Sequence, residues 1–182
     1  MEYFGLGDSV DSVVYKLGSR FSYCIGNILD PSYSFNRLTT GEGVIVEGYS
    51  IPYETDGGSY YITLEGIGWG EKRLNIYSSV FKRTMEGGGV ILDSGETLIY
   101  LSEVAYNLVG KNISSMLGGI LEHITNKKKP KLLCFQGIAS QELQGFPAMT
   151  FHLANGADIL INSWILAGFI LVLLDLYYLN LF

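Results

Sequence analysis

The residues best suited to chemistry are Asp93 and Ser94, which follow a short apolar run and precede Gly95. The three branched apolar residues at 90–92 are typical of a buried strand that ends at the carboxylate. Burying an unpaired carboxylate is costly, so an aspartate in this position needs hydrogen-bond donors or a chemical role. The tripeptide alone is weak evidence. Its weight comes from the apolar segments on either side.

Several elements must hold this tripeptide in place. Three glycines at 87–89 precede the apolar run, and a second apolar run at 98–101 indicates another strand directly after it. Ser102 is a good helix N-cap, and the apolar spacing after it predicts a helix to about Met116. The glycines at 118 and 119 would end that helix.

The rest of the chain carries mostly strand and turn signals. We expect strands at 44–46 and 60–64, with a turn at 56–58. The side chains of Tyr53, Tyr60 and Tyr61 are expected to pack or to line a groove. The chain has 13 Tyr, 9 Phe and 23 Gly but few long helical patterns, which favours a mainly β fold. Its 182 residues suit one domain, and 48% hydrophobic residues can supply a core.

Four segments in a fixed order carry a family resemblance: RFSYCIG at 20–26, YYITLEGIG at 60–68, the run at 90–101, and GFPAMTFH at 145–152. Together they resemble the pepsin-like aspartic proteases of plants, of the nepenthesin type. The resemblance implies one lobe of the bilobal pepsin-like fold, mainly β with a few short helices. It predicts a partial second lobe over residues 1–160 and an atypical apolar tail over 161–182.

The resemblance also implies an activity, aspartic-type endopeptidase, and a site. In this family two aspartates about 3 Å apart share a proton, and they act as base on a water molecule and as acid toward the scissile carbonyl. Asp93 would be one of them, Ser94 would tie its loop to the other lobe, and Gly95 would permit the tight loop. The implied partners are a polypeptide substrate and a first lobe carrying the other aspartate. No cofactor or metal is implied.

This chain departs from the family pattern in ways that keep other functions open. The first-lobe Asp-Thr-Gly motif is absent, and Glu96 stands where the family usually has Thr or Ser. We therefore expect the fragment to be inactive alone, and Glu96 to raise the pKa of one of the two acids. The alternatives are a non-catalytic binding protein like the xylanase inhibitors, which share this fold, and a non-functional truncated product.

Charge and histidine content argue against two classes of ligand. The formal net charge of −6 does not suit a nucleic-acid partner, because phosphate binding needs a basic surface. His123 and His152 are isolated from Cys and His at ligand spacing, which argues against a metal site. The lysines at 127–129 indicate a solvated loop.

Localisation rests on the resemblance, which implies a secreted protein, extracellular or vacuolar. The first residues lack the basic start of a signal peptide. Spacing alone leaves open whether Cys24 and Cys134 form a bridge or stay as free thiols. The apolar run at 164–174 is too short for a membrane span, so we expect no stable insertion. We expect instead that the tail packs poorly and leaves strand edges uncovered.

Overall fold

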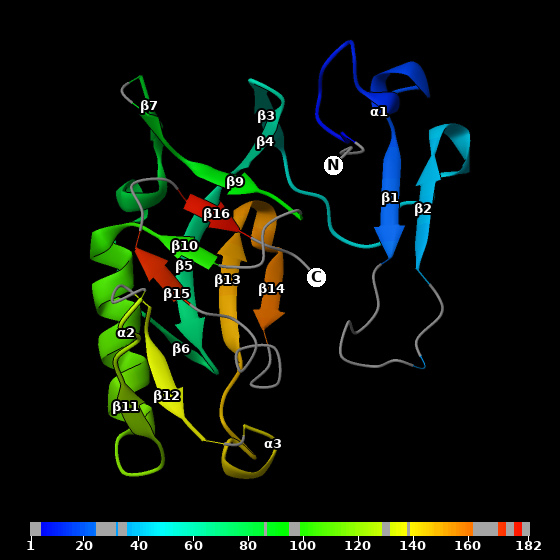
Figure 1. The fold of residues 1–182 in the computed structure, drawn as a ribbon. Coiled ribbons are helices and arrows are strands. Elements are labelled where there is room, and N and C mark those ends of the chain that lie inside the picture. The colour runs from blue at the N-terminus through cyan, green and yellow to red at the C-terminus, as the bar shows by residue number, and fades with distance from the viewer. Residues whose placement is uncertain are drawn as a thin grey trace.

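The chain folds into a mainly β structure, with a separate hairpin beside the main body (Figure 1). The computed structural model describes residues 5–24, 32, 36–85, 87–94, 99–128, 132–137, 139–161, 171–173 and 177–179. One helix of 15 residues is accompanied by short helical turns. The mainly β class with a few short helices is therefore confirmed.

The elements of the first half follow in this order: α1 (Val13–Lys16), β1 (Phe21–Cys24), β2 (Arg37–Thr40), η1 (Gly41–Gly43), β3 (Tyr53–Asp56), β4 (Ser59–Ile62), β5 (Leu64–Trp69), β6 (Lys72–Arg73), η2 (Ser78–Phe81), β7 (Arg83–Thr84), β8 (Gly87–Gly88) and β9 (Val90–Leu92). The second half contains β10 (Ile99–Leu101), α2 (Glu103–Leu117), β11 (Glu122–Ile124), β12 (Cys134–Gln136), α3 (Ala139–Glu142), β13 (Met149–Leu153), η3 (Ala154–Gly156), β14 (Asp158–Ile161), β15 (Leu171–Leu173) and β16 (Tyr177–Leu179).

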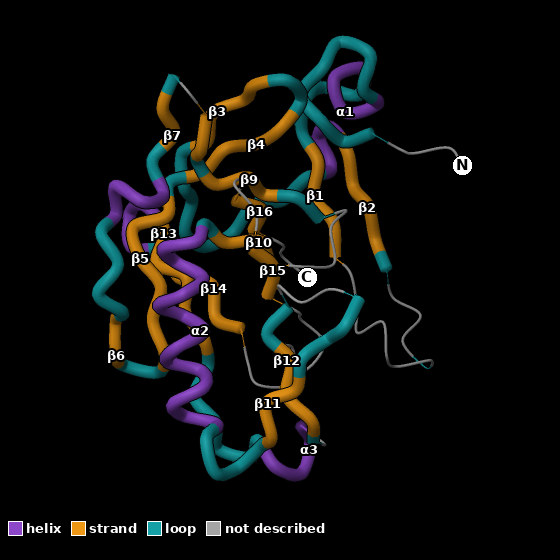
Figure 2. Tube along the Cα trace, turned by 60° about the vertical axis from the view of Figure 1, so that its left-hand side comes forward, coloured by secondary structure: helices purple, strands orange, loops and turns teal. Residues whose placement is uncertain are grey.

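The N-terminal hairpin stands to one side of the main body. Strands β1 and β2 pair antiparallel and lie apart from the larger sheets in Figure 1, and Figure 2 shows β2 on the outer side of β1. The ring of Phe21 on β1 lies 6.0 Å from the ring of Tyr60 on β4. An aromatic contact therefore links the hairpin to the main body.

The largest sheet has six strands in the order β15-β10-β16-β9-β4-β3. Strand β9 lies between β4, which is antiparallel to it, and β16, which is parallel. Strand β16 also pairs antiparallel with β10. This sheet carries the segment that ends at Asp93.

The turn predicted at 56–58 is confirmed and joins β3 to β4. Asp56 pairs with Ser59, so Gly57 and Gly58 form a two-residue hairpin loop. Their φ angles are 58° and 84°. Glycine adopts positive φ without steric cost, and a loop with two positive φ angles matches the twist of paired strands.

The second large sheet has four strands in the order β14-β13-β5-β6, all antiparallel. It shares one hydrophobic core with the six-stranded sheet and α2, in which Ile67, Ile99, Val109 and Phe151 are fully buried. Two sheets and a helix thus enclose the core, and α2 runs along one side of the sheets (Figure 1).

Helix α2 confirms the prediction made from its cap and its apolar spacing. The Ser102 hydroxyl accepts a hydrogen bond from the amide of Ala105, 3.2 Å away, which satisfies one of the free donors of the first turn. The helix ends at Leu117, one residue beyond the predicted end, and Gly118 caps it. The buried side chains of α2 are those of Ala105, Val109, Ile113 and Leu117.

One predicted strand is wrong and another is wrong in part. Residues 44–46 form no strand, and Ile45 and Val46 are 79% and 77% exposed, because η1 turns the chain away before any described strand can pair with them. The strand predicted at 60–64 is two strands interrupted at Thr63. Its carbonyl accepts from the amide of Ala154, 3.0 Å away, where the chain passes from one sheet to the other.

The apolar tail contributes two strands to the six-stranded sheet. Strand β16 fills the place between β9 and β10, and β15 pairs parallel with β10. The expectation that the tail leaves these edges uncovered is therefore wrong, because two short tail segments supply the missing backbone partners. In the part of the chain that the structure describes, no helix is long and apolar enough to cross a membrane.

Candidate functional site

Asp93 lies directly after β9, at the carboxyl end of a buried strand. Val90 and Ile91 are 1% and 5% exposed, whereas Asp93 and Ser94 are half-buried. Strand β9 is thus anchored in the core, whereas Asp93, the next residue after it, is partly exposed. This is the position that the sequence predicts for it.

The order of the strands places Asp93 at one edge of the sheet. Because β16 lies between β9 and β10, the chain leaves the sheet at Asp93 and re-enters it two strands away. Strand β16 runs parallel to β9, so both strands end at this edge. Gly95 and Glu96 fall outside the described residues, and their predicted roles stay predictions.

Tyr60 occupies the position beside this edge. It pairs with Leu92, and its hydroxyl donates to the carbonyl of Leu6, 2.8 Å away. Burial raises the pKa of Tyr60, and the charges of Asp8 and Tyr53 raise it further. The phenol is therefore held in its neutral, donating form.

The N-terminal segment approaches the same edge through two further contacts. The Thr55 hydroxyl donates to the Asp8 carboxylate, 2.8 Å away. A Cβ at Gly7 would lie 2.6 Å from the carbonyl oxygen of Gly58, so only glycine allows this close approach. The segment around Gly7 thus contacts the β3–β4 hairpin at the edge where Asp93 lies.

The packing role predicted for Tyr53 and Tyr60 is confirmed. Their ring centroids are 5.6 Å apart, with the planes at 70°. Edge-to-face pairs of this kind stabilise by about 1 kcal/mol beyond the apolar area that they bury. Tyr61 points to a different group: the guanidinium carbon of Arg83 lies 4.1 Å from the centre of its ring.

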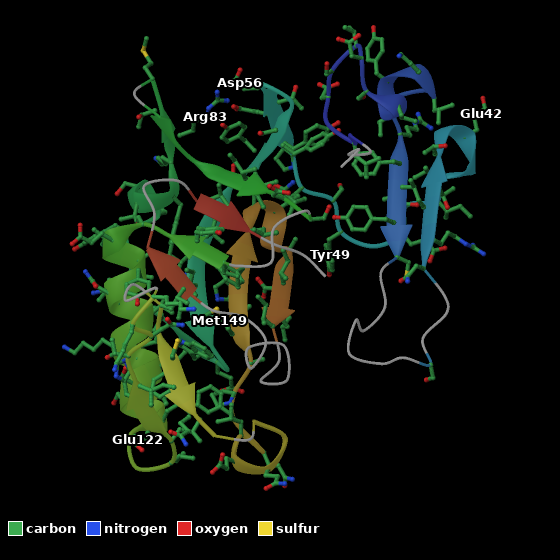
Figure 3. All side chains as sticks on the ribbon, viewed as in Figure 1. Glu42, Tyr49, Asp56, Arg83, Glu122 and Met149 are labelled. Carbon is green, nitrogen blue, oxygen red and sulfur yellow. The ribbon has the colours of Figure 1, made fainter. Side chains whose placement is uncertain are left out.

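Arg83 organises a pocket of about 680 Å³ along β3 and β4. Its guanidinium contacts the carboxylate of Asp56 and lies 3.8 Å from that of Glu54. Figure 3 shows Arg83 and Asp56 side by side. The pocket includes Val90 at the start of β9 but neither Asp93 nor Ser94. The sequence did not predict that Arg83, Asp56 and Glu54 come together. Their one signal in the sequence was the pair of cationic residues at 82–83, which precedes the glycines at 87–89.

His123 and His152 are both distant from Asp93 in the sequence, and each has its own neighbours. His152 on β13 pairs across the strands with Asp158 on β14, with 2.8 Å between Nδ1 and Oδ1. The ring of His123 stacks edge-on against Phe135 at 5.5 Å. Among the described residues, no three or more of His, Cys, Asp and Glu are grouped to hold a metal ion.

The cysteines are free thiols in this structure. Cys24 on β1 is exposed and Cys134 on β12 is half-buried. They lie on a hairpin at the side and on a strand of the main body (Figure 1). Burial raises the pKa of Tyr106, and the charge of Cys134 contributes.

Comparisons with known proteins agree with these observations. Residues 59–169, more than half of the chain, match the family described as "Xylanase inhibitor C-terminal". Aspartic proteinase nepenthesin-2 of Nepenthes gracilis is 34% identical over 158 residues, which cover 84% of this chain and 36% of that protein. Aspartic proteinase nepenthesin-1 of the same plant is 30% identical over 150 residues, covering 76% of this chain and 32% of that protein. The chain spans about a third of the length of these curated relatives.

A solved structure shows the same fold. The crystal structure of edgp superposes with a TM-score of 0.62 over 96% of this chain and 52% of that chain, at 15% identity. The matched family covers β4 to β14 and includes Asp93. The chain therefore belongs to the pepsin-like aspartic proteases of the nepenthesin type, as part of their second, C-terminal lobe.

Proposed function

We propose that this chain is the catalytic second lobe of an aspartic endopeptidase, and that Asp93 is one of its two catalytic carboxylates. The observation that carries the proposal is the position of Asp93 directly after the buried strand β9, at a solvent-accessible sheet edge. The two nepenthesins that the chain resembles are named aspartic proteinases.

The proposed chemistry needs a second carboxylate facing Asp93. Two carboxylates about 3 Å apart cannot both ionise, so they share one proton. The ionised member takes a proton from a water molecule, and the protonated member gives one to the scissile carbonyl oxygen. A first lobe, in the same polypeptide or in a separate one, supplies the other carboxylate. Ser94 and Gly95 would hold the Asp93 loop against it.

The test is cleavage of a denatured protein by this chain alone, and by the chain refolded with the first lobe of a nepenthesin. The chain alone is expected to be inactive, because half of a coupled pair cannot exchange the proton. The mixture is expected to cleave in acid and to be inhibited by pepstatin. Pepstatin-sensitive cleavage by the chain alone would contradict the need for a first lobe and would support a pair of Asp93 loops in a homodimer.

A non-catalytic binding role is the second candidate, because the matched family is described by xylanase inhibition. This reading predicts that the chain slows a xylanase and that Asp93→Ala leaves the inhibition unchanged. The peptidase reading predicts no effect on the xylanase. An inhibition assay with both forms of the chain separates the two.

We also propose that the protein works outside the cytosol, in the extracellular space or the vacuole. A water molecule activated between two carboxylates that share a proton suits an acidic compartment. Expression with a fluorescent tag, together with the sequence that precedes this lobe in its gene, tests the location. A cytosolic signal would contradict it.

A further inference from the structure

The pocket along β3 and β4 differs in chemistry from the Asp93 edge. It is bounded by residues of β3, β4, β5, β6, η2 and the start of β9, and about 680 Å³ is within the range of small-ligand pockets. Val90 precedes Asp93 by three residues, which is about 10 Å along a strand. A ligand in this pocket therefore need not occupy the site of the proposed peptide cleavage.

The base of the pocket is apolar. Its deepest lining side chains are each less than 8% exposed and belong to four separate elements: Ile62, Leu64, Phe81 and Val90. A ligand with an apolar side chain would displace water from the part of these apolar side chains that is still exposed in the pocket.

The wall of the pocket is held rigid by Arg83. Its guanidinium lies on the Tyr61 ring and contacts Asp56, so this cation is already neutralised. Gly89 allows the arrangement, because a Cβ there would lie 3.0 Å from the Cβ of Arg83 and 3.1 Å from the ring of Tyr61. Arg83 therefore shapes the pocket, and its charge is not available to a ligand.

Glu54 also lines the pocket and lies 3.8 Å from the Arg83 guanidinium, whereas three other charged lining groups lack such partners among the described residues. In the described part of the chain, no ion pair joins Lys82 or Arg73 to a carboxylate, and none joins Glu65 to a cation. Arg73 donates to the backbone carbonyl of Glu65. The pocket thus offers both cationic groups and an anionic group above an apolar base.

We propose that this pocket binds a short apolar peptide with both termini free. The peptide carboxylate is bound by Lys82 and Arg73, its ammonium by Glu65, and an apolar side chain lies over the base. A zwitterion matches the presence of both signs of charge, whereas a simple anion would meet Glu65. The proposal does not depend on the peptidase function, because Asp93 and Ser94 are not part of the pocket.

The test is calorimetric titration of the full chain with three forms of one dipeptide, phenylalanyl-leucine: free, C-terminally amidated and N-acetylated. The free dipeptide should bind about tenfold more tightly than either blocked form, since each block removes a hydrogen-bonded charge pair. The preference should weaken as salt is added. Equal affinity for all three forms, or no binding of any, would overturn the proposal.

Variants of the pocket residues, tested with the free and blocked dipeptides as a double-mutant cycle, show which side chain binds each peptide terminus. In Lys82→Ala the preference for the free over the amidated dipeptide should fall, and it should vanish when Arg73→Ala is added. In Glu65→Gln the acetylated and free forms should bind equally. The control is Lys72→Ala, an exposed lysine on β6 outside the pocket lining, which should keep the full preference. Circular dichroism shows whether each variant folds. A folded Lys82→Ala protein that still prefers the free carboxylate tenfold would contradict the assignment.

Discussion

At the scale of single residues, the proposed catalytic aspartate directly follows the side chains that anchor its strand in the core. Val90 and Ile91 are buried in the core, and Asp93 emerges from the strand that they form. Tyr60 lies across from Leu92 and fixes the N-terminal segment through its hydroxyl. The position of Asp93 therefore depends on the packing and hydrogen bonds of neighbouring side chains.

Replacing Tyr60 by phenylalanine should change the pH dependence of stability. Burial raises the pKa of Tyr60 in the folded state above its ordinary value of 10.0, with Asp8 and Tyr53 contributing. The stability due to the protonated phenol is fully present below about pH 10 and is lost as pH rises through the folded-state pKa. Denaturant unfolding from about pH 8 to about pH 11 should show a steeper alkaline loss in the wild type than in Tyr60→Phe. Parallel pH curves would contradict this assignment.

At neutral pH the same variant should be less stable by about 1 kcal/mol, because the hydrogen bond to the Leu6 carbonyl is lost. A matched control is Tyr15→Phe on α1, an exposed tyrosine. That change should leave the free energy of unfolding unaltered.

At the scale of elements, short sequence signals fix short structures. The Ser102 cap, the two-glycine turn after Asp56 and the strand ending at Asp93 were all predicted correctly, because each depends on local backbone geometry. The strand expected at 44–46 was not, because a strand also needs a partner, which sequence periodicity does not supply. The break at Thr63 was missed for the same reason, since it reflects a change of sheet.

The cap of α2 should contribute measurably to stability. Ser102→Ala removes the acceptor for the Ala105 amide and should lower the free energy of unfolding by about 1 kcal/mol. Ser115→Ala, at an exposed position within the same helix, is the control and should be neutral or slightly stabilising. Equal effects at both positions in thermal or urea unfolding would contradict the capping role.

Two glycines should respond to alanine in opposite directions. Gly89 has φ of +90° and no room for a Cβ beside Arg83, so Gly89→Ala should destabilise by more than about 1 kcal/mol. Gly110 lies within α2, where a Cβ would make an ordinary contact of 3.8 Å with Leu133. Gly110→Ala should stabilise by up to about 1 kcal/mol. Urea unfolding of the two variants checks both signs, and a shared sign would be inconsistent with the backbone conformations.

At the scale of the whole molecule, the sequence predicted the mainly β class and the family, through motifs whose order is specific. It did not predict how residues beyond 161 pair, because their apolar composition suits a strand, a core segment or an aggregate equally well. It also missed the Arg83 pocket, since residues 54, 61 and 83 meet only through the fold. The division into a lobe over 1–160 and a separate tail stays a prediction.

The tail strands should support the sheet that carries Asp93. Deleting residues 171–182 removes β15 and β16 and leaves the backbone edges of β9 and β10 without partners. We expect a lower urea midpoint and a greater tendency to self-associate. Deleting only residues 180–182 is the control. An unchanged midpoint in the longer deletion would contradict the pairing of the tail.

The central claim is that Asp93 performs acid–base chemistry with a partner carboxylate. The most direct test is the kcat of the chain refolded with a nepenthesin first lobe, compared between wild type and Asp93→Asn. The amide keeps the shape of the side chain but cannot exchange the shared proton. We predict a loss of at least about a thousandfold in kcat with the far-ultraviolet dichroism unchanged. A reconstituted Asp93→Asn protein that cleaves at the wild-type rate would show that Asp93 is not catalytic.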